Sequence, residues 1–282
     1  MKKLFSAIAV AAALISATAV QAGPVVTQWG YNVQSNWNTG STVFSGGGGT
    51  QVNTNDVISW GGTGDYTIAN QPSGIARSAI AIEGGTIGAP STGLVNTNLS
   101  VLPATGTPLG VGSLVAHYNR TLDSSFSTLK KTRLTSNLIL NPNLPTNLPP
   151  FPAFSVGFGI DFIETPNTAG GCFTGSISVC DDIFVLDIPS LSQDFLYDGN
   201  IYTVNQFTTS GSLGPLSPAA CAAAGVAAGC IGFITQEGVK NIAQFGFSIT
   251  SRPQVIPEPG SIALLGLGLL GLAAIRRRKT SV

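Results

Sequence analysis

The single histidine of this 282-residue chain lies close to an asparagine, and the two residues are the first candidates for chemistry. One residue separates His117 from Asn119, so on a β-strand their side chains share one face while Tyr118 points to the other. That face could bind a polar ligand or a metal. Such a pair more often hydrogen-bonds neighbouring loops, and we expect that structural role for His117 and Asn119 while keeping them as a possible ligand face.

Acidic residues are the next candidates. A glycosidase needs two carboxylates facing across a sugar, and Asp161 and Glu164 follow an apolar strand pattern. Asp181 and Asp182, near Asp187, could join a calcium site, but solvated hairpin ends are the favoured interpretation. The chain has one histidine and no Gly-x-Ser-x-Gly motif, so no hydrolase triad is recognisable. We therefore predict a non-enzymatic protein with no catalytic residue, no metal and no cofactor.

Four cysteines form two close pairs in the sequence, Cys172 with Cys180 and Cys221 with Cys230. An even number in an exported protein favours disulfide bonds, although four cysteines allow three connectivities. The local pairs are the simplest choice, and each would contribute about 2–3 kcal/mol by closing a short loop. A metal site is less favoured, because seven and eight residues separate the members of the pairs and paired zinc ligands usually lie closer.

Hydrophobic residues alternate with small or polar ones along much of the chain, which is the pattern of half-buried β-strands. The clearest strand covers residues 154–162, and residues 245–249 and 134–140 follow the same pattern. Further strands are expected at residues 25–33, 75–82, 114–122, 182–188 and 201–207. This spacing predicts one all-β domain over residues 23–254, an antiparallel β-sandwich of the jelly-roll or immunoglobulin-like kind.

This domain also contains a proline-rich segment and several aromatic residues that could contact a ligand. Residues 141–152 contain five prolines, which cannot donate to a central strand. We expect a surface connection there, and a domain boundary is the less favoured alternative. Aromatic side chains can stack on sugar rings, although core packing is their commoner fate. The candidates of this kind are Trp29, Trp37, Trp60 and Tyr66.

The N-terminus carries an export pattern. Lys2 and Lys3 precede an apolar run, and small residues occupy the positions that a signal peptidase reads. Residues 1–22 are therefore predicted to form a signal peptide that is cut between Ala22 and Gly23. An N-terminal membrane anchor is the less favoured alternative, because the run is short and rich in alanine.

The C-terminus carries a second pattern. A proline–glutamate–proline turn precedes fifteen uncharged residues, 261–275, and a basic cluster follows at once. Fifteen helical residues span about 22 Å, and basic side chains reaching towards the interface help such a helix to cross a membrane. We expect a C-terminal transmembrane helix whose basic end stays in the cytoplasm. The residues expected to direct sorting are Pro257, Glu258, Pro259, Arg276, Arg277 and Arg278.

This order of turn, apolar helix and basic cluster resembles the PEP-CTERM sorting signal of Gram-negative bacteria, over residues 255–279 of a segment that we assign to 255–282. The resemblance implies processing by an exosortase, a membrane protease/transpeptidase, and an association with exopolysaccharide and biofilm loci. Ala116-His117-Tyr118-Asn119 and the early aromatic residues are similar to a PEP-CTERM subfamily named for a Thr-His-x-Asn motif, with Ala116 in place of threonine. The subfamily resemblance would cover most of residues 25–165 and implies no activity.

The charge of the exported body limits its partners. Between the two targeting segments lie seven basic and twelve acidic residues, a net charge of −5, and without a basic cluster a nucleic-acid partner is excluded. We expect a protein that the secretion machinery exports, that is tethered briefly at the inner membrane, and that an exosortase sends to the cell surface or extracellular matrix. Its predicted role is structural or adhesive, with uncharged Asn/Thr/Gly-rich faces meeting exopolysaccharide. A secreted glycan-processing hydrolase is the alternative.

Overall fold

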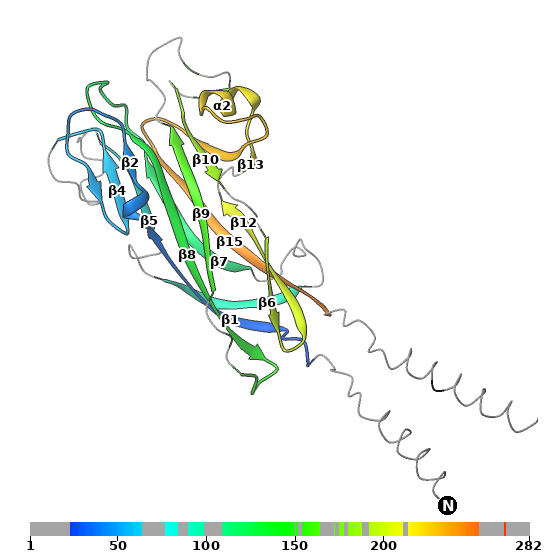
Figure 1. The fold of residues 1–282 in the computed structure, drawn as a ribbon. Coiled ribbons are helices and arrows are strands. Elements are labelled where there is room, and N and C mark those ends of the chain that lie inside the picture. The colour runs from blue at the N-terminus through cyan, green and yellow to red at the C-terminus, as the bar shows by residue number, and fades with distance from the viewer. Residues whose placement is uncertain are drawn as a thin grey trace, which may run out of the picture. The chain divides into compact units, whose positions relative to one another are not determined.

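The computed structural model describes residues 23–63, 77–83, 90–98, 109–149, 151, 154–163, 172, 175–177, 180–187, 192–210, 214–253 and 268 (Figure 1). The predicted signal peptide, nearly all of the predicted sorting tail, Tyr66 and Glu164 lie outside these ranges. Within them, no helix has the length and apolar character needed to cross a membrane. The predicted transmembrane helix at residues 261–275 falls almost entirely outside the described part of the chain.

The described chain is mostly β-sheet with almost no helix, as the alternating pattern predicts, so the all-β class is confirmed. The first half contains β1 (Gln28–Trp37), β2 (Val43–Phe44), β3 (Val52–Asn53), β4 (Val57–Trp60), β5 (Ser78–Glu83), β6 (Ser91–Asn98), β7 (Gly110–Tyr118) and β8 (Leu129–Leu144). The second half contains β9 (Phe154–Ile163), β10 (Asp182–Asp187), β11 (Ser192–Tyr197), β12 (Asn200–Ser210), β13 (Gly214–Pro215), β14 (Ile231–Thr235) and β15 (Lys240–Pro253). A single 3-10 turn, η1 (Thr39–Ser41), and a short helix, α2 (Pro218–Ala223), accompany these strands.

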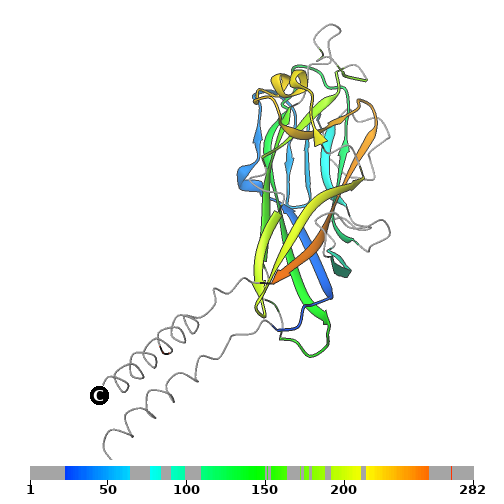
Figure 2. The same ribbon diagram turned by 90° about the vertical axis from the view of Figure 1, so that its right-hand side faces the viewer.

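The strands pair in the order β13-β14-β10-β9-β8-β1-β6-β15-β7-β5-β4-β3. Strands β2 and β11 lie off this path, on β8 and β12, and β12 also pairs with β15, which Figure 2 shows in yellow and orange. The pairings of β1 with β6 and β8 are antiparallel. The short contact between β6 and β15 is parallel, and it joins the two halves of the path.

Side chains from both halves of this path meet in one hydrophobic core. Trp37 and Leu134 come from β1 and β8, whereas Ile80 and Val115 come from β5 and β7. Burial of such apolar side chains is the main favourable contribution to folding. The cluster consists of Trp37, Ile58, Trp60, Ile80, Ile82, Val115, Leu129, Leu134, Phe184, Leu186, Phe233, Ala243 and Phe245.

The chain divides into two compact units. The larger unit comprises residues 25–195 and 202–251, and it contains the core and most of the paired strands. The smaller unit comprises residues 1–24, 196–201 and 252–282. Its described part consists of residues 23–24, the tip of the β11–β12 hairpin, and residues 252–253 and 268.

One prediction about the chain connections is wrong for its first four residues. The expected surface connection at residues 141–152 begins inside β8, which continues to Leu144 and includes Pro142. A register shift between Gln28 and Trp29 places Pro142 opposite Trp29. Among the described residues, β8 has no β9 partner beyond Leu138. The end of β8, where Pro142 lies, is therefore paired with β1 alone within the described part of the chain. Proline, which has no backbone N–H, is tolerated at such a position because a strand paired on one side has no neighbouring strand on the other side to which an N–H would donate.

Candidate functional site

Strand β1 separates its side chains cleanly onto two faces. Its burial alternates along the whole strand, with Trp29, Tyr31 and Trp37 among the buried residues. The intervening positions are Gln28, Gly30, Asn32, Gln34 and Asn36, and none of them is charged. A period of two is the geometry of a strand with one buried and one solvent-facing side, so the outer face of β1 is lined by side-chain amides.

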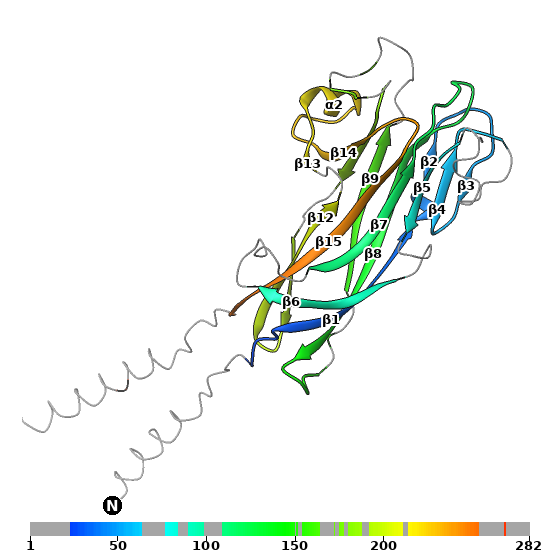
Figure 3. The same cartoon turned by 180° about the vertical axis from the view of Figure 1, so that it is seen from behind.

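The neighbouring strands extend this lining. Directly opposed residues of paired strands share a face, and β6 places Thr92 beside Asn32 while β8 places Asn137 beside Gln34. Figure 3 shows β1 beside β6, with the end of β8 near them. We call this surface the amide face, and it comprises Gln28, Asn32, Gln34, Asn36, Thr92, Asn96, Thr135, Asn137, Asn141 and Asn143.

Some amides of this face bond one another and others are available. Gln28 donates from Nε2 to Oδ1 of Asn96 at 3.0 Å and accepts from Nδ2 of Asn143. Across the described part of the chain, no hydrogen bond joins the side chains of Asn32, Gln34, Asn36 and Asn141 to protein. A carboxamide offers two donor hydrogens and an accepting oxygen. These four groups can therefore both donate hydrogen bonds to a hydroxyl-rich ligand and accept hydrogen bonds from it.

Two apolar side chains interrupt the amides. Leu94 lies opposite Gly30 and is 51% exposed, and Ile139 lies opposite Asn32 and is 38% exposed. Their exposure places methyl groups between carboxamides on one sheet surface. A sugar ring has the same mixture of apolar C–H groups and hydroxyls, so the face has the chemical composition to bind an uncharged glycan.

The predicted pair His117 and Asn119 lies in the interior instead of on this face. His117 is 1% exposed, and its Nδ1 is 2.9 Å from Oγ1 of Thr235. Asn119 donates from Nδ2 to the backbone oxygen of Thr235 at 3.3 Å. The two side chains therefore share a face, as the strand pattern predicts, and Tyr118 packs with a different apolar cluster. The contact with Thr235 is the structural arrangement that the sequence favours.

The surroundings of His117 hold it neutral. The imidazole stacks on Trp60 with ring centroids 6.0 Å apart, and Phe184 meets it edge-on at 5.0 Å. Burial lowers the pKa of His117 from 6.5 to about 3, because these apolar rings cannot solvate an imidazolium ion. Oδ2 of the buried Asp182 lies 4.0 Å from Nε2 of His117. A neutral imidazole here can accept or donate hydrogen bonds within the core.

The acidic candidates are placed differently from the prediction. Asp181 and Asp182 were expected to be solvated, but both are fully buried. Asp181 is held by the loop that precedes it, since its Oδ2 accepts from the backbone N–H of Ile177 at 2.6 Å. No group of three metal-binding side chains occurs among the described residues. The side chains of Asp161 and Asp187 and all of Glu164 lie outside what the structure describes.

The three tryptophans proposed for sugar stacking are core residues. Trp29 and Trp60 are 0% exposed and Trp37 is 1% exposed. Tyr202 meets the ring of Trp29 edge-on at 5.1 Å, and Nε1 of Trp29 donates to Oγ1 of Thr97 at 3.0 Å. Such aromatic contacts stabilise a core, so these rings are not available to a surface ligand.

Two disulfide bonds are present, and each joins the cysteines that are nearest in the sequence, Cys172–Cys180 and Cys221–Cys230. Cys221 lies on α2, whose first turn is capped by Oγ of Ser217 accepting from the N–H of Ala220. The second bond thus ties α2 to the start of β14. Both predicted pairs have a structural role, because they close loops beside the strands.

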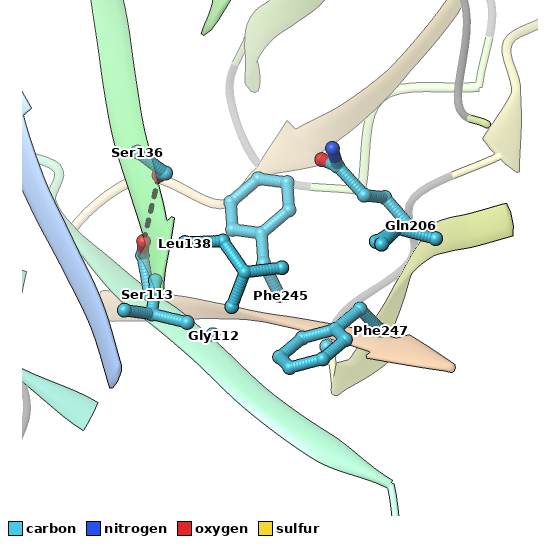
Figure 4. Close-up of a pocket in the computed structure, with 10 residues that line it drawn as sticks. Gly112, Ser113, Ser136, Leu138, Gln206, Phe245 and Phe247 are labelled. Atoms are coloured by element: carbon cyan, nitrogen blue, oxygen red, sulfur yellow. Dashed lines mark hydrogen bonds between the residues drawn. The ribbon is translucent and has the colours of Figure 1, made fainter. Parts of the chain in front are cut away.

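Two hollows lie apart from the amide face. Figure 4 shows the smaller one, about 40 Å³, which is lined by Phe245, Phe247 and Leu138 and, on one side, by the hydrogen-bonded hydroxyls of Ser113 and Ser136. Its volume suits one or two water molecules and not a sugar ring. The larger hollow, about 540 Å³, lies beside the β14–β15 turn. Two of its polar side chains are engaged within the protein, since Asn241 bonds the backbone of Gln236 and Lys240 pairs with Glu83.

Comparison with protein families identifies a PEP-CTERM protein-sorting motif at residues 255–279. The motif implies an extracellular protein that is sorted by an exosortase and exported through the membrane to the cell surface. The match does not reach the Thr-His-x-Asn segment. A search of curated proteins found no significant match.

Proposed function

We propose that this protein is a structural or adhesive component of the extracellular matrix, and that its amide face binds uncharged exopolysaccharide. The observation that supports this most directly is the set of four carboxamides without protein partners among the described residues, on Asn32, Gln34, Asn36 and Asn141. They lie on paired strands, whose backbone hydrogen bonds fix their spacing. Binding by such a face needs no catalytic group.

The chemistry of the face selects the class of ligand. A polysaccharide supplies hydroxyls that donate to amide oxygens and accept from amide nitrogens, and its C–H surfaces can contact Leu94 and Ile139. The exported body carries a net charge of −5, so an anionic polymer gains no overall electrostatic attraction to it. The ten members of the amide face are uncharged, and the exposed basic residues Lys131 and Arg133 lie beyond Thr135 on β8. An uncharged glycan suits the surface best.

The proposed function also includes processing at both ends of the chain. The signal peptide is removed at Ala22–Gly23, the tail tethers the chain to the inner membrane through residues 261–275, and the exosortase acts near Pro257–Pro259 before release to the matrix. The core shared by both halves of the strand path favours a two-layered β-sandwich as the scaffold. We also propose that the chain belongs to the Thr-His-x-Asn subfamily, because Ala116-His117-Tyr118-Asn119 resembles its motif.

The amide face is tested by removing its free carboxamides. In Asn32→Val/Gln34→Val, valine keeps the strand preference but loses two hydrogen-bonding groups. We expect binding to the producer's own purified exopolymer to weaken about tenfold, since two net hydrogen bonds amount to about 1–3 kcal/mol. The matched control is Gln51→Val/Gln193→Val, which removes two exposed amides outside the face and should leave binding unchanged.

Equal binding by the two double variants would overturn the role of the amide face. The same incubation is assayed for new reducing ends, which a glycan-processing hydrolase produces and a binder does not. Mass mapping of both termini, on protein from membranes and from the exopolymer, tests the sorting. A chain in the exopolymer that lacks Arg276–Lys279 supports processing, whereas an intact chain confined to membranes contradicts it.

A further inference from the structure

The tip of the β11–β12 hairpin is a two-residue turn made by Asp198 and Gly199. Both have left-handed backbone angles, with φ of 48° and 73°, as a type I′ hairpin turn requires. Aspartate tolerates this conformation better than most residues that bear a Cβ. The turn fixes the carbonyl and carboxylate of Asp198 at one end of the hairpin, within the smaller unit.

Gly23 is held at this turn by hydrogen bonds at both of its backbone polar groups. Its N–H donates to the carbonyl oxygen of Asp198 at 2.8 Å. Its own carbonyl accepts from Nδ2 of Asn200 at 3.0 Å, and the same Nδ2 is 3.2 Å from the carbonyl of Asp198. The residue that is predicted to follow the signal-peptidase cut is therefore fixed at a defined site.

The carboxylate of Asp198 lies against Gly23 as well. A Cβ built on Gly23 would be 1.8 Å from Oδ2 of Asp198, so only glycine fits there without movement. A Cβ position is about 2.5 Å from the backbone nitrogen of its own residue. The carboxylate oxygen is consequently within about 4.3 Å of the Gly23 nitrogen, which is the range in which opposite charges interact.

We propose that Asp198 is the binding site for the α-ammonium group that signal-peptide removal creates at Gly23. This inference rests on the proposed cut between Ala22 and Gly23. In the precursor the Gly23 nitrogen has one hydrogen, which the Asp198 carbonyl accepts. Hydrolysis of the Ala22–Gly23 peptide bond leaves an amine that takes up a proton, and the new hydrogens face the carboxylate. Maturation thereby adds an ion pair to the existing backbone hydrogen bond.

The test measures the pKa of the Gly23 amine on the mature, exported protein, by acetylating it across a pH series and reading the N-terminal peptide by mass spectrometry. We expect the amine pKa in the native protein to exceed that in Asp198→Asn by about half a unit, the shift that an exposed ion pair produces. Asparagine also adopts left-handed angles, so the turn is retained. Asp123→Asn removes the same charge from a turn in the larger unit and should give the native value.

A second variant keeps the test decisive if Asp198→Asn is produced poorly. Gly23→Ala retains the carboxylate but forces it away from the amine, so the amine pKa should fall as it does in Asp198→Asn. Equal amine pKa values in the native protein and both variants, with position 23 verified as the first residue of each mature chain, would overturn the pairing alone. A mature native chain that begins at another residue would overturn the proposed cut together with the pairing.

Discussion

His117 and Thr235 lie 118 positions apart in the sequence, yet Nδ1 of the imidazole is 2.9 Å from the threonine hydroxyl in the core. Thr235 ends β14 and His117 lies near the end of β7, so the contact joins the two halves of the strand path. The protein thus uses its one histidine as an internal hydrogen-bonding group. Its role in stability is open to direct measurement.

Stability should depend on pH through this histidine. Folding lowers the pKa of His117 from 6.5 to about 3, so between these values the unfolded chain binds the additional proton. The free energy of unfolding should therefore be independent of this histidine above about pH 6.5. As the pH drops towards 3, it should fall by at most about 1.4 kcal/mol per pH unit. Urea unfolding at several pH values measures it. In His117→Gln this contribution should vanish, and identical profiles for the two proteins would contradict the assignment.

Truncation of the same side chain should be costly at neutral pH. His117→Ala leaves a cavity between Trp60 and Phe184 and removes the partner of Thr235. We expect a loss of about 2–4 kcal/mol in the free energy of unfolding. The control, Gln51→Ala, alters an exposed amide and should change stability by less than about 0.5 kcal/mol. Similar denaturation midpoints for both variants would show that the core tolerates the loss.

Two opposed glycines in β13 and β14 should respond differently to the same change. A Cβ on Gly232 would be 1.9 Å from the backbone oxygen of Phe184, whereas one on Gly214, its partner in the strand pair, would meet nothing within 4 Å. Gly232→Ala should thus destabilise the protein by about 1–3 kcal/mol, because β14 must move away from β10. Gly214→Ala should be neutral or slightly stabilising. Thermal unfolding compares them, and a neutral Gly232→Ala would contradict the close packing.

The disulfide at α2 should contribute to stability independently. Replacing Cys221 and Cys230 together by serine opens a loop with a sequence separation of 9 residues. The expected loss is about 2–3 kcal/mol from the greater freedom of the unfolded chain. Unfolding of the double variant should match that of the native protein in which this bond has been reduced. A variant as stable as the oxidised protein would argue against that contribution.

The sequence predicted much of the secondary structure because strand periodicity is a local property. Phe154–Ile163 and Asp182–Asp187 were expected within one residue of their observed ends. The alternating amides of β1 are evident in the sequence as well. The surface that they form could not be predicted, because it includes Thr92 and Asn137, which other strands place beside β1. A search for amides at every second position would have found Gln28 and Asn32 in the strand predicted at residues 25–33, but Gln34 and Asn36 lie beyond its predicted end.

The sequence alone determined where the protein is sent, because the sorting motif at residues 255–279 is a contiguous segment that is recognised by its order of residues. It also predicted the all-β class and favoured the two local cysteine pairs among three possible connectivities, and the structure contains both pairs. Only the tertiary structure decided that Asp181 and Asp182 are buried and that Pro142 lies in a strand. Burial and strand pairing depend on residues far apart in the chain, which no local pattern records.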